Sequence, residues 1–394
     1  MTDLILRLKP HEERRLRAGH LWVYSNEIDT ERSPLKGLPA GALCRFEDSR
    51  GKPLGTGYVN PHALLCARVL TGQGDAVIDA DWFARRLRTA LTLRQRIYQQ
   101  PYYRLVHGEG DGLPGLVIDR YGDYCVVQIG TAGMENLRPQ LLEALQAELS
   151  PKGIVLRNDS PSREAEELPL YVEDIGAVPQ TVTIEEGGVR FEVAMHGGQK
   201  TGWFFDQADN RDRLARYARN ARVLDVFSYA GGWALRAHAF GAKEVAAVDS
   251  SAPALEAASH NAGLNGATLE TLRGQALDVL KQLAVEGRRF ELVVVDPPAL
   301  IKRKKDHEEG LGLYGRLNRA ALNLLTPGGI LVSCSCSYHL EAAELQRVLL
   351  RESRASGRRL QILEQGGQGP DHPVHPAIPE TRYLKAYFCA AAQE

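Results

Sequence analysis

The alternation of apolar and polar residues predicts two kinds of structure in the N-terminal half of the chain. Over the first ~75 residues, short β-type runs such as LCRFED and LLCARVL are separated by Gly, Pro and Asn, which predicts a small barrel. From Asp81 to Tyr98, apolar residues recur every three or four positions, which predicts a helix. Strand-like segments and an amphipathic helix near 134–149 follow, and they predict a compact α+β unit.

After about residue 210, β-type runs alternate with helical segments. VLDVFSYAGG, EVAAVDSS, FELVVVDPPAL and GGILVSCSCSY are typical of buried strands, while PALEAASHNAGLNG and residues 312–325 are typical of helices. This order predicts an α/β fold with a doubly wound parallel sheet, whose ligands bind at the carboxyl ends of the strands. We expect three domains: 1–76, 77–186 and 187–394.

The composition narrows the class of protein. A chain of 394 residues is suited to two or three domains, and 44% hydrophobic with 25% charged residues is typical of a globular protein. We find no apolar run near the roughly 18 residues of a membrane span and no signal peptide. The six cysteines lack metal-ligand spacing, so we expect a cytoplasmic protein without a metal or a membrane partner.

The net charge of −1 argues against purely electrostatic binding of nucleic acid but leaves local basic patches open. There are two candidate RNA-binding patches. The first contains Arg14, Arg15 and Arg17, and the second contains Lys302, Arg303, Lys304 and Lys305. Either patch, taken alone, is equally consistent with a solvated surface.

Aspartates follow successive predicted strands, at Asp225, Asp249, Asp278 and Asp296. One such acid is commonplace, but four together with a glycine turn indicate a ligand site. The turn after Asp225 is Phe227, Ser228, Tyr229, Ala230, Gly231 rather than GxGxxG, which disfavours a pyrophosphate-bearing nicotinamide cofactor. An adenosine ligand without phosphates, S-adenosyl-L-methionine, fits better. We expect Asp225 to meet its cationic amino group, Asp249 its ribose and Asp278 its adenine amino group.

The candidate chemistry lies at the next strand ends. Asp296, Pro297 and Pro298 form a rigid triplet, and Ala299 stands where an amino-group methyltransferase usually has an aromatic residue. Carbon 5 of a pyrimidine attacks a methyl sulfonium only after a thiolate has added to carbon 6. Cys336 is the predicted nucleophile because it lies nearer the strand's carboxyl end than Cys334. Asp296 would hydrogen-bond the cytosine ring edge, and the base that removes the carbon-5 proton is not identified.

Several segments resemble the RlmI-type 23S rRNA (cytosine-5)-methyltransferase family over the full length of the chain. They are GEGDGLPGLVIDRYG (108–122), GGQKTGWFFDQADNR (197–211), VLDVFSYAGGWAL (223–235), DPP (296–298), SCSY (335–338) and DHPV (371–374). The resemblance implies an N-terminal PUA RNA-binding domain, a central α+β domain and a Rossmann-like class I methyltransferase domain. It also implies one cytosine of 23S rRNA as the substrate.

The same resemblance implies further site residues. It makes Cys336 the catalytic thiol, with Cys334 outside the motif, and it places Lys200, Thr201, Gly202, Phe205 and Asp206 at the cofactor pocket. Ser250, Asn261 and Pro297 complete the predicted cofactor set. Ala299 departs from relatives that often carry lysine, which puts the contact with the substrate backbone in doubt. Two alternatives stay open: methylation of another RNA atom (uracil carbon 5 or a guanine amine), and a non-catalytic RNA-binding ribosome-assembly factor. A homodimer is also open.

Overall fold

The computed structural model describes residues 4–196 and 202–393, and the contacts divide the chain into two units. The first unit comprises Met1–Val182, Ala194–Phe205 and Pro370–Thr381. The second comprises Thr183–Val193, Asp206–Gly369 and Arg382–Glu394. Segments that are distant in sequence therefore belong to one unit.

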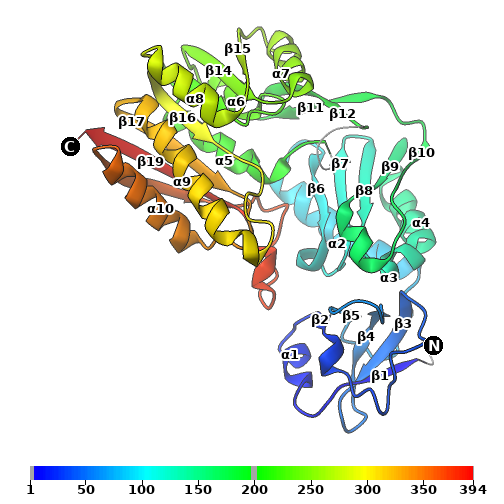
Figure 1. Ribbon diagram of the computed structural model, residues 1–394. Coiled ribbons are helices and arrows are strands. Elements are labelled where there is room, and N and C mark those ends of the chain that lie inside the picture. The colour runs from blue at the N-terminus through cyan, green and yellow to red at the C-terminus, as the bar shows by residue number, and fades with distance from the viewer. Residues whose placement is uncertain (1–3, 197–201, 394) are drawn as a thin grey trace. The chain divides into compact units, whose positions relative to one another are not determined.

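The N-terminal part of the first unit is a five-stranded sheet, drawn in blue in Figure 1. Its strands, in spatial order, are β1 (Ile5–Arg7), β3 (Ala42–Glu47), β4 (Pro53–Val59), β5 (Ala67–Thr71) and β2 (Trp22–Val23), with α1 (Glu13–Arg17) beside them. Leu6, Phe46 and Val59 are fully buried in its core. Gly57 permits the close approach of β4 to β5, because a Cβ there would lie 2.0 Å from the Arg68 carbonyl oxygen.

The rest of the first unit is built on a second five-stranded sheet. Its spatial order is β10 (Tyr171–Gly176), β9 (Gly153–Asn158), β8 (Tyr124–Ile129), β7 (Leu116–Tyr121) and β6 (Tyr102–His107). α2 (Ala80–Ile97) packs against α4 (Arg138–Leu149), and both contribute to the core of this sheet. The helix predicted near 134–149 is divided into α3 (Ala132–Asn136) and α4, because Pro139 lacks the N–H that a continuous helix needs.

A hairpin of β11 (Thr181–Glu186) and β12 (Val189–Ala194) precedes the main part of the second unit. That unit contains a seven-stranded sheet in which β19 runs antiparallel to the other six strands. The spatial order is β15 (Glu270–Arg273), β14 (Glu244–Asp249), β13 (Arg222–Val226), β16 (Phe290–Val295), β17 (Leu325–Ser335), β19 (Lys385–Gln393) and β18 (Arg358–Gly366). The predicted α/β fold with a parallel sheet is confirmed.

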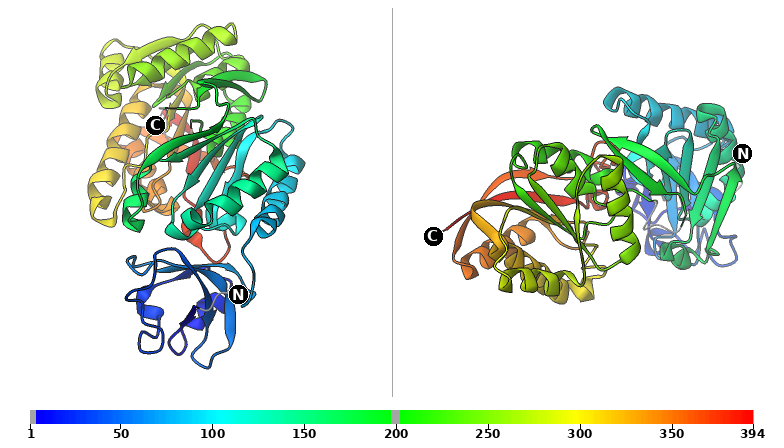
Figure 2. Two further views of the ribbon diagram at one scale, coloured as in Figure 1. Left: turned by 90° about the vertical axis from the view of Figure 1, so that its right-hand side faces the viewer. Right: turned by 90° about the horizontal axis from the view of Figure 1, so that it is seen from above.

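Helices cover both faces of this sheet, as Figure 2 shows. The core on one face joins the strands to α8 (Ala276–Val285), α9 (His307–Leu324) and α10 (Ala342–Ala355), and the core on the other joins them to α6 (Gly232–Ala239). α5 (Ala208–Asp212) and α7 (Ala252–Leu264) complete the helices of the unit. α9 begins at His307, five residues before the predicted start. Because β13, β14 and β16 are parallel neighbours, their carboxyl ends meet at one edge.

Candidate functional site

The turn after β13 adopts an unusual backbone conformation that its neighbours hold in place. Phe227, Tyr229 and Gly231 have φ angles of 69°, 50° and 82°, in the left-handed region that favours glycine. The side-chain amide of Asn261 donates to the Ala230 carbonyl oxygen (3.1 Å) and accepts from the Glu192 N–H (2.8 Å). The predicted ligand Asn261 therefore connects this turn to β12.

Asp225, in β13, is an acid without exposure to solvent. Its Oδ2 atom accepts a hydrogen bond from the Ala234 N–H (3.0 Å), but its Oδ1 atom is buried and has no hydrogen-bond partner among the described residues. Burial, together with the negative charges of the nearby Asp296 and Asp249, raises the pKa of Asp225 to about 8. A buried oxygen left in this state is costly, and it suits a cationic ligand group.

Asp249 is the last residue of β14 and is half-buried. Its two carboxylate oxygens accept from the Tyr229 N–H (3.1 Å) and the Ser251 N–H (2.9 Å). Because a carboxylate has about four lone-pair positions, each oxygen can still accept another bond. Ser250 is exposed beside it, and Asp278 is exposed in the first turn of α8 rather than at the end of a strand.

Asp296 directly follows β16, and its carboxylate is fixed by two side chains from other elements. The Gln207 Nε2 atom lies 3.0 Å from both carboxylate oxygens, and the Trp233 Nε1–H donates to Oδ2 (2.9 Å). Gln207 is itself held by Asn210, whose Nδ2 atom donates to the Gln207 Oε1 atom (2.7 Å). Gln207 and Trp233 were not predicted, because they lie 89 and 63 residues from Asp296 and no local pattern connects them to it.

The two cysteines near this edge have different environments. Cys334 lies within β17 and is fully buried, and burial raises its pKa well above the usual value. Cys336 lies one residue beyond β17 and is half-buried, and its Sγ atom is 4.0 Å from the Pro297 carbonyl oxygen. Because the thiolate is the nucleophilic form, Cys334 is poorly suited to reaction and Cys336 is the better candidate.

Side chains from two other elements fix the segment around Cys336. The Tyr314 hydroxyl lies 2.8 Å from the Ser335 Oγ atom and 2.9 Å from the Ser337 Oγ atom. The Lys385 Nζ atom donates to the Ser337 carbonyl oxygen (2.6 Å), and burial lowers the pKa of Lys385 to about 8. Lys385 was not predicted, although a lysine in the otherwise apolar run KAYFCAAA is a signal that could have identified it.

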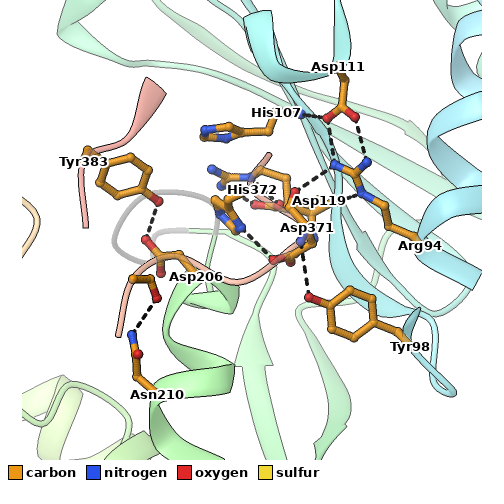
Figure 3. Close-up of polar contacts among 12 residues, drawn as sticks. Arg94, Tyr98, His107, Asp111, Asp119, Asp206, Asn210, Asp371, His372 and Tyr383 are labelled. Carbon is orange, nitrogen blue, oxygen red and sulfur yellow. Dashed lines mark hydrogen bonds and ion pairs between the residues drawn. The ribbon is translucent and has the colours of Figure 1, made fainter. Parts of the chain in front are cut away.

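The remaining predicted cofactor residues are dispersed. Asp206 is buried in the second unit, where its Oδ2 atom accepts from the Tyr383 hydroxyl (2.6 Å; Figure 3). Pro297 is buried. Phe205 belongs to the first unit, where its ring packs against Tyr121, and Gly202 belongs to the same unit. Lys200 and Thr201 lie outside the described residues.

Two of the segments that carried the family resemblance meet in the first unit. Arg94 is fully buried and forms two hydrogen bonds of 2.7 Å with Asp111 and one of 2.8 Å with the Asp371 carbonyl oxygen (Figure 3). Asp371 in turn accepts from the Arg104 N–H (2.9 Å). These contacts account for the GEGDG and DHPV segments as parts of one buried polar network.

The two predicted RNA-binding patches belong to different units. In the first, Arg15 pairs with Glu27 and Arg17 with Asp48, each at 2.6 Å, while Arg14 is exposed beside His11. In the second, Lys302, Arg303, Lys304 and Lys305 are all exposed, and Arg303 pairs with Asp306 (2.9 Å). Across the described residues there is no cluster of three or more His, Cys, Asp or Glu side chains suited to a metal, and no helix is long and apolar enough to cross a membrane.

Comparisons with known proteins give two family matches. Residues 172–386 match a family described as S-adenosylmethionine-dependent methyltransferase, and residues 6–72 match a PUA-like domain. The chain is 36% identical to ribosomal RNA large subunit methyltransferase I of Cronobacter sakazakii, over 96% of each chain. It is 38% identical to the protein of the same name from Tolumonas auensis, over 98% of each.

Solved structures show the same fold at lower identity. A methyltransferase complexed with SAH has a TM-score of 0.84 at 18% identity, covering 98% of this chain and 100% of that one. A SAM-dependent methyltransferase from Streptococcus mutans has a TM-score of 0.82 at 17% identity, with the same coverage. Both proteins resemble this chain from its first sheet to its last.

The raised pKa of Asp225 predicts how stability depends on pH. In the folded chain without ligand the acid titrates near 8, whereas its ordinary value is 3.8. The folded state therefore binds more protons between these values, so its stability falls as pH rises from about 4 to about 8. Asp225→Asn should flatten this dependence by about 1 kcal/mol per pH unit between pH 5 and 7. Chemical denaturation at several pH values measures how the free energy of unfolding of each protein changes with pH. Equal slopes for the wild type and Asp225→Asn would contradict the raised pKa of Asp225.

Proposed function

The chain belongs to the S-adenosylmethionine-dependent ribosomal RNA large subunit methyltransferase I family, and on that premise we propose that it methylates carbon 5 of a cytosine in 23S rRNA through a covalent adduct with Cys336. The observation that carries the proposal is the position of this thiol. Its Sγ atom lies 4.0 Å from the Pro297 carbonyl oxygen, next to Asp296 and at the strand edge that also holds Asp225 and Asp249.

The chemistry divides one difficult step into easier ones. The Cys336 thiolate adds to carbon 6 of the cytosine, which makes carbon 5 nucleophilic enough to accept a methyl group. When bound, S-adenosylmethionine supplies that methyl group on a sulfonium sulfur. Loss of the carbon-5 proton then allows the thiolate to leave and restores the aromatic ring. The target base must leave its stack to reach the thiol, so the enzyme acts on single-stranded or opened RNA.

The proposed role of Asp296 follows from the way its carboxylate is held. The Gln207 side chain donates to both carboxylate oxygens, and the Trp233 side chain donates to Oδ2. These bonds fix the orientation of the Asp296 carboxylate. The lone pairs that remain can accept from the cytosine ring edge and favour a proton on N3 while the adduct exists. Lys385 is a positioning residue, because it donates to the carbonyl oxygen of Ser337, the residue after Cys336.

The residues present fit the cofactor. The buried Asp225 Oδ1 atom lacks a partner among the described residues and would receive the cationic amino group of the methionine moiety. Asp249 would hold the ribose hydroxyls with its remaining lone pairs, and Asp278 the adenine amino group. The Phe227–Gly231 turn, with Ser228, Tyr229 and Ala230, would surround them. The other members of the proposed set are Lys200, Thr201, Gly202, Phe205, Asp206, Ser250, Asn261 and Pro297.

Contacts with RNA phosphates would come from the two basic patches. We assign Lys302–Lys305 the larger role, since three of its side chains are exposed lysines, whereas Arg15 and Arg17 are paired with Glu27 and Asp48. Such contacts position RNA without selecting its sequence.

The cofactor assignment predicts a loss of affinity on truncation of Asp249. Asp249→Ala removes the ribose acceptor and leaves the Tyr229 and Ser251 N–H groups without their partner, so affinity for S-adenosylmethionine should fall by about 1–3 kcal/mol. Isothermal titration calorimetry measures this change. Glu308→Ala, which alters an acid with 93% of its side chain exposed, is the control and should bind as the wild type does. Unchanged affinity in Asp249→Ala would remove this residue from the cofactor site.

The thiol assignment predicts opposite results for the two cysteines. Cys336→Ala should lower methyl transfer from labelled cofactor to 23S rRNA by more than about a thousandfold, while cofactor affinity stays near that of the wild type. Cys334→Ala, the matched control, should keep most of the activity and lose some stability. Mass spectrometry of the product nucleosides identifies the methylated atom, and 5-methyluridine or a methylated guanine amine would contradict the proposal. Strong turnover by Cys336→Ala would contradict the mechanism.

A further inference from the structure

A cavity of about 310 Å³ lies in the first unit, where its two sheets meet. Strands β6, β8 and β9 end at this cavity and β7 begins there, and β5 contributes one side chain. Its polar wall includes Arg68, His107, Gln128, Arg157, Ser162 and Arg163. The cavity shares no residue with the proposed cofactor and thiol sites.

The three arginines of the wall are ordered in advance by carboxylates outside it. Arg68 pairs with Glu166 (2.8 Å), Arg157 with Asp159 (3.2 Å) and Arg163 with Glu135 (2.9 Å). Their side chains are only 13%, 7% and 0% exposed, so little conformational entropy remains to be lost when a ligand binds. Among the described residues that line the cavity, the one carboxylate is Glu109.

Arg163 is the most deeply buried arginine of the wall. Its Nε atom donates to the Pro169 carbonyl oxygen (3.0 Å), and its Nη1 atom donates to Glu135 and to the Ile129 carbonyl oxygen. Its Nη2 atom is buried and has no hydrogen-bond partner among the described residues. Arg163 therefore adds positive charge to the wall, while Arg68 and Arg157 keep some exposed side-chain surface and can donate to an anionic oxygen directly.

The cavity also has room and apolar surface beyond what a bare anion requires. Its volume lies at the lower end of the range for small-molecule sites. Val117 lines the cavity and is half-buried, so it contributes apolar surface against which an unstacked base can lie. Gln128 can both donate to and accept from the edge of a base.

We propose that this cavity binds one unstacked nucleotide of the rRNA substrate, with its phosphate on Arg68 and Arg157 and its base against Val117 and Gln128. The proposal rests on the proposed function for its choice of RNA as the ligand. The captured nucleotide is a different one from the methylated cytosine, which reacts at Cys336. Its role is to hold the RNA, so its loss affects substrate binding rather than the chemical step.

Two variants test the cavity by independent changes. Arg157→Gln removes a positive charge from the wall. Gly130→Leu fills the cavity, and the backbone can accommodate it, because the nearest atom to a Cβ at this position is the Gly115 carbonyl oxygen at 3.5 Å. Arg88→Gln is the control: this arginine also pairs with a glutamate in the first unit, but its side chain is 63% exposed on α2, away from the cavity.

Filter binding with a 23S rRNA transcript should show affinity reduced by about tenfold in Arg157→Gln and Gly130→Leu and unchanged in Arg88→Gln. In methylation assays KM should rise by a similar factor while kcat and the affinity for S-adenosylmethionine stay near wild type. Wild-type rRNA affinity in both cavity variants would overturn the proposal. The proposal would also be overturned if the two cavity variants lost binding to cytidine monophosphate or to inorganic phosphate but kept the rRNA affinity of the wild type. The cavity would then be a site for free anions. Filter binding measures RNA affinity without requiring methyl transfer. If the cavity variants bind rRNA more weakly but the wild type does not methylate cytosine, only the proposed function is contradicted.

Discussion

The arrangement of the site depends on how the Asp296 carboxylate is fixed. Asp296 follows a central strand, and its two oxygens receive N–H groups from Gln207 and Trp233. Trp233 lies in the helix that begins directly after the Phe227–Gly231 turn, and Gln207 precedes α5. The Asp296 carboxylate therefore connects three segments: the residues before α5, the start of α6 after the proposed cofactor turn, and the Asp296–Pro298 triplet. Since Pro297 supplies the carbonyl oxygen nearest to the Cys336 thiol, the same bonds also govern the surroundings of the proposed nucleophile.

Burial of charged and polar groups gives this site its chemical character. Asp225 and Lys385 are both buried, and burial shifts the pKa of each to about 8, upward for the acid and downward for the amine. Burying such groups lowers the stability of a fold, and groups of this kind are concentrated at functional sites. A cationic cofactor group would neutralise Asp225, and Lys385 holds the backbone beside a thiol that must become an anion. The network of Arg94, Asp111 and Asp371 is also buried, but its charges are paired within the chain, which is consistent with a structural role.

Local patterns predicted the central strands and the acids at or next to their carboxyl ends. Asp225, Asp249 and Asp296 each stand at the end of an apolar run, so the parallel sheet and the shared edge followed from the sequence, and family matches confirm the predicted PUA-like and methyltransferase parts. Gln207, Trp233 and Lys385 were not predicted, because their roles arise from contacts between elements far apart in the chain. Strands β18 and β19 were missed for a related reason: β19 is inserted between β17 and β18, an order that only tertiary pairing determines. The inclusion of Ala194–Phe205 and Pro370–Thr381 in the first unit has no local signal either.

The proposed mechanism requires the Cys336 sulfur to form a bond to the target cytosine. A 23S rRNA transcript containing 5-fluorocytosine in place of cytosine tests it most directly, because fluorine at carbon 5 cannot be removed as a proton is, and the adduct persists after methyl transfer. In the presence of S-adenosylmethionine, the wild-type enzyme should form a complex with this RNA that survives denaturation, and digestion followed by mass spectrometry should place the nucleotide on the peptide that contains Cys336. Attachment through Cys334, or methylation of ordinary transcript without any trapping of the fluorinated one, would contradict the claim.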